Sequence, residues 1–171
     1  HPEVRKRLYD YSLNLSRRVS YTNSGTLEFL VQGGERADAP IYFLEMNTRI
    51  QVEHPVTELV HGVDLVQLQL RVAAGERLSD VPSSSTGIGS AIEYRISAED
   101  PKRDFAPAMG EVKYLSRVGG PGLREDGWVE AGSVVSPYYD SLLFKVIVSG
   151  SDRTEALDRS RTYLDEYLVE G

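Results

Sequence analysis

The stretch EMNTRIQVEHP, residues 45–55, alternates strongly polar side chains with Met, Thr, Ile and Val. In an extended strand, successive side chains point to opposite faces, so the polar residues of this stretch would share one face. They are Glu45, Asn47, Arg49, Gln51 and Glu53. One interpretation is a strand with a solvated polar face and apolar residues packed beneath it. The other is that the polar face forms a site.

A hairpin is the simplest arrangement around this stretch. Residues 24–32 and 41–46 are rich in the aromatic and branched residues typical of strands, and a polar loop with Gly and Pro separates them. If Gln32 pairs with Ile41, Glu28 lies directly opposite Glu45. The register of the hairpin therefore decides whether two carboxylates face each other.

Two facing carboxylates need something that offsets their repulsion. Like charges opposite each other destabilise a strand pair by up to about 1 kcal/mol. Together with the amide oxygen of Asn47, Glu28 and Glu45 form an all-oxygen set that suits Mg²⁺ or Mn²⁺. The sequence thus predicts a divalent cation site here, unless water separates an exposed pair or the register is slipped.

The length of a strand divides this polar face into two parts. Glu45 and Asn47 are about 7 Å apart in a strand, whereas Glu45 and Glu53 are roughly 26 Å apart if the chain stays straight. Glu53 therefore cannot share a cation with Glu45 unless the segment curls. Either the later residues bind a neighbouring part of the substrate, or the chain wraps around it.

Composition excludes several classes of function. The chain has 171 residues, a formal net charge of −7 and no cysteine. An acidic chain does not favour a nucleic-acid backbone as partner, and the lack of cysteine excludes disulfides and thiolate ligands. No apolar run reaches the length of about 18 residues that spans a bilayer, so no membrane partner is expected. His54 and His61 are seven residues apart with no third nitrogen or thiolate ligand nearby, which argues against zinc.

The first half of the chain predicts helices on both sides of the hairpin. Apolar residues recur at spacings of three and four from Pro2 to about Arg18, which indicates an amphipathic helix. After Pro55 we expect further helix, and residues 63–78 are apolar enough for a mostly buried helix that Gly75 ends.

The second half predicts an antiparallel sheet closed by a helix. Residues 79–90 combine serines, glycines and a proline, so we place a boundary there, with domains at 1–85 and 86–171. Short strand-like pieces follow, and Asp152 with Glu155 has the spacing of a helix capping box. The residues expected to face inward from that helix are Ala156, Leu157, Ser160, Leu164 and Tyr167. The expected fold class is α+β.

A specific resemblance covers essentially the whole chain. Residues 43–78, FLEMNTRIQVEHPVTELVHGVDLVQLQLRVAAGERL, resemble the signature region of biotin carboxylases. IEYRISAED (92–100), GGPGLRED (119–126) and SPYYDSLLFKVIV (136–148) continue the resemblance in the same order. Biotin carboxylases are ATP-grasp enzymes. They use ATP to convert bicarbonate to carboxyphosphate and then carboxylate biotin held on a carrier protein.

The resemblance implies a nucleotide and cation site in the hairpin. By match to the family, Glu28, Glu45 and Asn47 would hold two Mg²⁺ or Mn²⁺ ions that bridge the ATP phosphates. Leu30 and Leu44 match apolar residues that sandwich the adenine. On either interpretation, both leucines are expected to be core residues.

The resemblance also implies a bicarbonate and biotin site. Arg49, Gln51 and the backbone of Val52 would bind bicarbonate, and Glu53 would remove its proton. Arg95 would hold phosphate and stabilise the biotin enolate. On this basis we expect the chain to leave the sheet after Asn47 and curl. The alternatives are that the arginines form surface ion pairs and that Glu53 caps the following helix.

Further expectations concern the parent protein. The family's glycine-rich lid, nucleotide-binding lysines and N-terminal domain lie upstream of the matched region, so the chain is expected to be a C-terminal fragment that does not turn over ATP alone. The parent would work with a biotin carrier and a carboxyltransferase component, in the cytoplasm or, in a eukaryote, the mitochondrion. Residues 119–126 resemble a segment that pairs subunits, with Arg124 retained but Pro121 where an aromatic residue can occur.

Two other functions remain open at this point. One is another ATP-grasp ligase that joins a different acid to an amine, as in carbamoyl-phosphate or purine-pathway enzymes. The runs RIQVEHP and EYRISAED disfavour it. The other is a non-catalytic interaction domain. The final carboxyl acceptor is not expected to be encoded in this chain, because acetyl-CoA, propionyl-CoA, methylcrotonyl-CoA and pyruvate carboxylases share this component.

Overall fold

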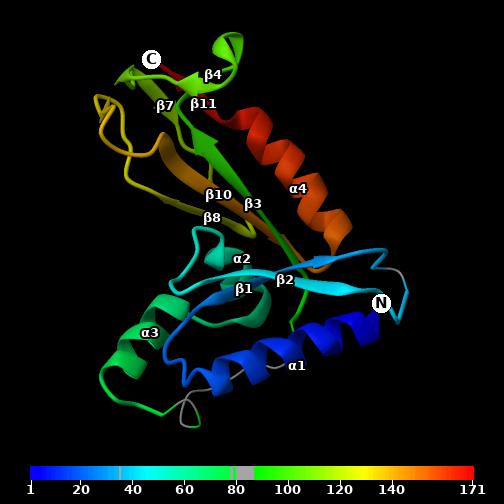
Figure 1. Ribbon diagram of the computed structural model, residues 1–171. Helices are drawn as coiled ribbons and strands as arrows, with labels where there is room; N and C mark the ends of the chain where they lie inside the picture. Colours follow the sequence, from blue (N-terminus) through cyan, green and yellow to red (C-terminus); the bar gives the residue numbers. More distant parts are fainter. Residues whose placement is uncertain (35, 78, 80–86) are drawn as a thin grey trace. The chain divides into compact units, whose positions relative to one another are not determined.

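Figure 1 shows the computed structural model, which describes residues 1–34, 36–77, 79 and 87–171. The chain divides into two compact units, and each is described by itself. Unit 1 comprises His1–His54 and Asp64–Ser83, and unit 2 comprises Pro55–Val63 and Ser84–Gly171. The α+β fold class is confirmed. The predicted boundary between residues 85 and 86 falls within segment 80–86, which lies outside the described residues, so it stays a prediction.

Unit 1 begins with helix α1, Pro2–Arg18, as the spacing predicts. Pro2 stands in its first turn, where a missing N–H costs nothing, and the His1 side chain accepts a hydrogen bond from the Glu3 N–H. Arg17 and Arg18 lie in the last turn, where positive charge interacts favourably with the helix dipole. No helix within the described residues is long and apolar enough to cross a membrane.

Strands β1, Thr26–Val31, and β2, Ile41–Asn47, form the predicted antiparallel hairpin. Its end nearest the loop pairs Val31 with Ile41, so the expected Gln32–Ile41 pair is wrong. The register shifts by one residue between Glu28 and Phe29, because a bulge in β2 leaves Leu44 without a partner. Beyond the bulge, Glu28 pairs with Glu45 as predicted.

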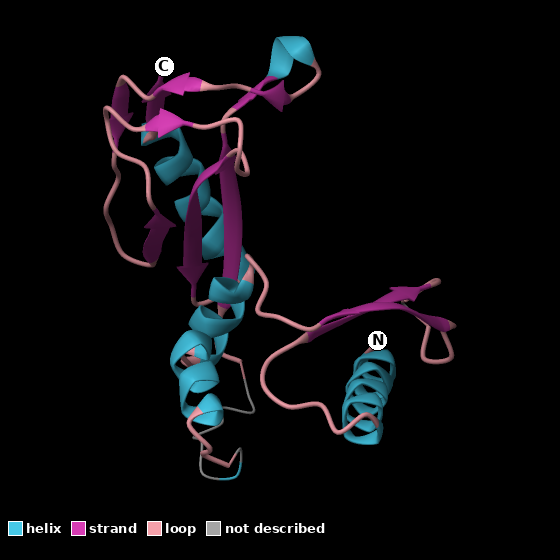
Figure 2. Ribbon diagram, turned by 60° about the vertical axis from the view of Figure 1, so that its left-hand side comes forward, coloured by secondary structure: helices cyan, strands magenta, loops and turns pink. Residues whose placement is uncertain are grey.

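The hairpin has two different faces. Figure 2 shows α1 lying along one of them. On this face the rings of Phe29 and Phe43 meet edge to face at 5.8 Å between centroids, and Tyr11 and Leu15 of α1 line the same hollow. Because side chains alternate along a strand, the residues between them point to the other face, which carries Glu28.

Helices α2, His54–His61, and α3, Leu65–Ala73, follow the hairpin. The Asp64 side chain caps α3 by accepting from the Gln67 N–H at 2.7 Å, and the left-handed Gly75 follows its end as predicted. The expectation that α3 is mostly buried is wrong: none of its residues is buried, and Leu70 is 68% exposed. A high share of apolar residues shows that a helix has apolar surface, but it does not show whether neighbouring segments bury that surface.

The core of unit 2 is built around β10, Leu142–Gly150, whose residues 143–148 are all buried. It lies between β3, Ser90–Ser97, and β8, Leu123–Gly127, and both pairings are antiparallel. Shorter pairs surround this sheet: β4 (Glu99–Asp100) with β5 (Ala106–Pro107), β6 (Gly110–Glu111) with β9 (Val134–Val135), and β7 (Tyr114–Ser116) with β11 (Leu168–Glu170). A 3-10 turn, Pro101–Arg103, follows β4.

Helix α4, Arg153–Glu166, packs on this sheet as predicted (Figure 1). Asp152 accepts from the Glu155 N–H at 2.9 Å, and the Glu155 carboxylate accepts from the Ser151 N–H at 2.6 Å. Of the residues expected to face inward, Ala156 and Ser160 are buried, whereas the other three are half-buried. Tyr163, which the spacing argument missed, is buried and donates to Pro121 O at 2.9 Å.

Candidate functional site

The candidate site lies on the face of the hairpin that carries Glu28. Asn47 Nδ2 donates to Glu28 Oε1 at 2.9 Å and to Glu45 Oε1 at 3.1 Å. Gln51 Nε2 donates to the same Glu28 Oε1 at 3.0 Å. We call these four residues the acid–amide cluster. Sequence alone predicted that Glu28, Glu45 and Asn47 lie together, and the structure adds Gln51 to them.

The bulge and the end of β2 bring these residues together. By shifting the register one residue, the bulge sets Glu45 opposite Glu28, with Asn47 two positions on and thus on the same face. The expected curl is confirmed, because β2 ends at Asn47 and Gln51 returns to Glu28. In a straight strand Gln51 would be roughly 13 Å beyond Asn47.

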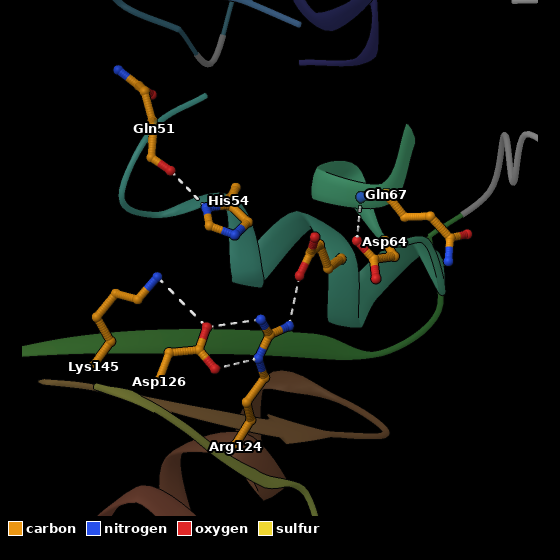
Figure 3. A network of polar contacts seen from close by, with 8 residues as sticks. Gln51, His54, Asp64, Gln67, Arg124, Asp126 and Lys145 are labelled. Carbon is orange, nitrogen blue, oxygen red and sulfur yellow. Dashed lines mark hydrogen bonds and ion pairs between the residues drawn. The ribbon is translucent and has the colours of Figure 1, made fainter. Parts of the chain in front are cut away.

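A turn connects the cluster to the helix that follows. The Gln51 carbonyl accepts from the His54 N–H at 3.3 Å and lies 2.7 Å from His54 Nδ1 (Figure 3). This double contact fixes the backbone of Gln51 against the first residue of α2. The side chain that reaches Glu28 therefore extends from an anchored position.

The side-chain donors that contact the acidic pair in unit 1, as far as the structure describes it, are neutral amides. Within the described residues of unit 1, no Arg, Lys or His side chain forms an ion pair with Glu28 or Glu45. Glu28 is half-buried, so solvent alone screens its charge incompletely. A bound cation would therefore stabilise this pair of carboxylates.

The cluster fits a hard divalent cation by its donor chemistry. The described residues contain no group of three His, Cys, Asp or Glu side chains placed to hold a metal, so a site here depends on the amide as well as the two carboxylates. Asn47 now presents its N–H₂ to both of them. Turning the amide over exchanges N–H₂ for oxygen and completes an oxygen set suited to Mg²⁺.

The other predicted bicarbonate residues lie in the turn after β2. Arg49 is exposed, and its Nη1 donates to Ile50 O at 3.2 Å rather than contacting the acidic pair. Val52 is half-buried and Glu53 is exposed. Gln51 is thus the member of this group whose side chain contacts the cluster.

Leu30 and Leu44 are exposed by 58% and 52%, so the expectation that they are core residues is wrong. Leu30 lies two residues from Glu28 on the same face, opposite Tyr42, which is 54% exposed. An exposed apolar surface therefore continues from the acidic pair along the hairpin.

Arg95 lies in unit 2, in the second half of β3, and is exposed. It pairs in register with Lys145 of β10, which is itself buried. Two cationic side chains thus stem from directly opposed positions of this sheet. The sequence found Arg95 by resemblance, but nothing in the pattern indicated its cationic neighbour.

A second charged group in unit 2 was missed by sequence reasoning. Arg124 holds Asp126 with two bonds, at 2.8 and 2.7 Å, and Glu58 of α2 at 2.6 Å (Figure 3). Lys145 Nζ lies 3.7 Å from Asp126 Oδ2. We call these four residues the Arg124 network. The hydrogen bonds with Asp126, and then with Glu58, outweigh partial burial and raise the pKa of Arg124.

Comparison with known protein families now adds to this geometry. Residues 93–171 match the biotin carboxylase C-terminal domain, and residues 1–81 match the ATP binding domain of the carbamoyl-phosphate synthase L chain. The biotin carboxylase of Pseudomonas aeruginosa is 46% identical over 169 residues. Biotin carboxylase 1 of Bacillus subtilis is 44% identical over 169 residues. Each alignment covers 99% of this chain, but only 36% and 37% of the two relatives.

Solved structures agree with these relatives. The biotin carboxylase domain dimer of Hydrogenobacter thermophilus 2-oxoglutarate carboxylase, in complex with MgADP, ADP and bicarbonate, superposes with a TM-score of 0.91 at 42% identity. The biotin carboxylase subunit of pyruvate carboxylase gives a TM-score of 0.90 at 39% identity. Both alignments cover 100% of this chain and 37% of the other. The chain thus spans about a third of the length of the relatives it matches.

Proposed function

Because this chain belongs to the biotin carboxylase family, we propose that it supplies the cation and bicarbonate part of an ATP-dependent biotin carboxylation site. One observation carries the proposal: the amides of Asn47 and Gln51 converge on Glu28, opposite Glu45. A proposed cation-binding residue and a proposed bicarbonate-binding residue are thereby in direct contact. The MgADP and bicarbonate named for the Hydrogenobacter structure support this pairing of ligands.

The acidic pair and the leucines would hold the nucleotide. Glu28, Glu45 and the turned-over amide of Asn47 would ligate Mg²⁺, or Mn²⁺ in its place. When bound, such an ion supplies positive charge that offsets the charge of the ATP phosphates. Leu30 and Leu44, exposed beside the carboxylates, would cover the adenine ring.

The turn after β2 would position bicarbonate. Arg49, the Gln51 amide and the Val52 N–H are donors suited to a planar oxyanion. Glu53 would accept the bicarbonate proton, so that the freed oxygen attacks the γ-phosphorus and ADP leaves with the former bridging oxygen. The product of this step would be carboxyphosphate.

Arg95 would serve the second half of the reaction. A guanidinium keeps its charge and offers paired donors, which suits it to phosphate and to the negative oxygen that develops on the ureido group of biotin. Its exposure leaves it accessible to such ligands. Biotin would arrive on a carrier protein or domain, and a carboxyltransferase component would accept the product.

Pairing of two copies through residues 119–126 is a separate proposal. The Hydrogenobacter relative is named as a dimer. In this chain, however, the hydrogen bonds of the Arg124 guanidinium go to Glu58 and Asp126 within unit 2. A partner would therefore have to contact Arg124 without breaking the Arg124 network, or would use neighbouring residues.

A chimera tests the proposed function. The 171 residues would replace the aligned third of the Pseudomonas aeruginosa biotin carboxylase, with which they share 46% identity. We expect bicarbonate- and biotin-dependent ATP hydrolysis, a fall of at least about 100-fold with Glu53→Gln, the proposed base, and no change with Glu3→Gln on α1. A folded chimera without activity, or one indifferent to Glu53→Gln, would contradict the proposal. By itself the 171-residue chain is expected to hydrolyse no ATP, measured as phosphate release.

A further inference from the structure

One oxygen of Glu28 is the meeting point of the acid–amide cluster. Asn47 Nδ2 and Gln51 Nε2 both donate to Oε1, at 2.9 and 3.0 Å. A carboxylate oxygen offers two lone-pair positions, so these two N–H groups fill the oxygen that faces the cluster. A cation that ligates this oxygen must displace at least one of them.

The amides of Asn47 and Gln51 can respond differently to an incoming cation. Asn47 lies at the end of β2, within reach of both carboxylates, and remains a ligand if its amide turns over. Gln51 is in the turn after the strand and contacts the pair through Glu28 alone. Its N–H₂ faces the position of an incoming cation, and the positive hydrogens repel that charge.

We propose that Gln51 competes with the divalent cation for Glu28, so that cation binding releases the Gln51 amide to donate to an anion. The inference rests on the proposed function, which assigns bicarbonate to Gln51, and adds a coupling between the two ligands. Before the cation binds, Glu28 holds the Gln51 amide. After it binds, the two N–H groups of Gln51 are available to a planar oxyanion.

Thermodynamic linkage makes this coupling reciprocal. An oxyanion that holds the Gln51 amide removes the competitor from Glu28, so the anion raises cation affinity by the same factor by which the cation raises anion affinity. The anchored backbone of Gln51, held at His54, limits the change to the side chain. The chain thereby favours binding of cation and anion together over binding of either alone.

Substitution of Gln51 tests the inference, because the inference requires Mn²⁺ affinity to rise rather than fall. In the 171-residue chain without bicarbonate, we expect Gln51→Ala to bind Mn²⁺ about three- to tenfold more tightly than the wild type, the equivalent of one net hydrogen bond. Free Mn²⁺ is measured by electron paramagnetic resonance. Weaker binding would make Gln51 a ligand, and unchanged binding would make it a structural contact, and each would overturn the inference.

Two controls separate this inference from the proposed function. Gln67→Ala, on exposed α3 of the same unit, should leave Mn²⁺ affinity unchanged. If the proposed cation site is right, Glu28→Gln should lower Mn²⁺ affinity by at least about tenfold, both in the wild type and in Gln51→Ala. If Mn²⁺ binding depends on Glu28 but is no tighter in Gln51→Ala than in the wild type, the inference is overturned and the proposed cation site stands. No Mn²⁺ binding by either protein overturns the cation site and the inference together.

Discussion

Two carboxylate clusters in the described part of the chain are compensated in opposite ways. In the Arg124 network, Glu58 and Asp126 are bound by a guanidinium, and Lys145 approaches the latter. In the acid–amide cluster, the side-chain hydrogen bonds that Glu28 and Glu45 receive within the described residues of unit 1 come from the amides of Asn47 and Gln51. The first arrangement supplies its own positive charge. The second leaves a place for positive charge from a ligand, and for this reason we propose a structural role for the first and a binding role for the second.

Burial strengthens the contrast. Glu58 is 6% exposed and Lys145 8% exposed, so the Arg124 network exchanges water for protein partners. Charges in such a place are tolerated only when they are paired and hydrogen-bonded. Glu45 is exposed and Glu28 half-buried, which leaves the acid–amide cluster accessible. The two clusters therefore respond differently to loss of one member.

The largest expected loss of stability comes from a substitution in the Arg124 network. Arg124→Met removes the 2.6 Å partner of the buried Glu58, and we expect the free energy of unfolding to fall by about 2–4 kcal/mol. Urea denaturation followed by circular dichroism measures it. Arg161→Met, whose ion pair with Asp158 is exposed, is the matched control and should cost less than about 1 kcal/mol. Equal effects of the two changes would remove the distinction between a buried and a surface pair.

A smaller effect is expected at the acid–amide cluster. Glu28→Gln relieves the repulsion with Glu45 but keeps an oxygen that accepts hydrogen bonds, so the free energy of unfolding should change by less than about 1 kcal/mol. Mn²⁺ affinity should nevertheless fall by at least about tenfold, because a carboxylate ligand is lost. Destabilisation as large as that of Arg124→Met would show that Glu28 is structural.

The smallest expected effect on stability concerns Glu155, whose carboxylate accepts hydrogen bonds from Ser151 and forms a 2.6 Å ion pair with Arg159. Hydrogen bonds from Ser151, first its side chain and then its backbone, lower the pKa of Glu155, and the nearby Arg159 adds to this. A lowered pKa means that the native state prefers the ionised form. The stabilisation is thus present above the pKa of the unfolded chain and is lost as pH falls through the native pKa.

The variant Glu155→Gln tests the direction of this pH dependence. We expect the variant to unfold at a lower temperature than the wild type at neutral pH, and the difference in melting temperature to vanish in acid. Glu166→Gln, on an exposed residue of the same helix, should show no such pH dependence. A difference that grows in acid would mean that the Ser151 contacts favour the protonated form instead.

Much of the candidate site could be predicted because it depends on local geometry. The alternation in residues 45–53 placed Glu45 and Asn47 on one face, and the reach of a strand meant that Glu53 could share their cation only if the chain curled. The facing pair Glu28 and Glu45 was predicted with the right partner but a partly wrong register. The expected pairing had no bulge, and the structure restores the Glu28–Glu45 pair with one at Leu44.

Other features depend on contacts that no sequence spacing encodes. The apolar pattern of α3 predicts a helix but not that its apolar residues stay exposed. The apolar side chains of Leu30 and Leu44 would suit a core as well as a surface that binds a ligand. Glu58 and Arg124 are 66 residues apart, so their contact exists only once α2 meets the sheet of unit 2. Roles assigned by resemblance, such as those of Glu53 and Arg95, stay predictions until the variants are measured.

The sequence by itself therefore determined the helices, the hairpin, the α+β class and the chemistry of the polar face, because strand periodicity and residue type act over a few positions. Tertiary structure alone decided that Gln51 returns to Glu28 and that the Arg124 network supplies its own cations. The physical reason is that charge compensation depends on which groups meet in space, and chain folding brings together residues whose separation in sequence carries no such information.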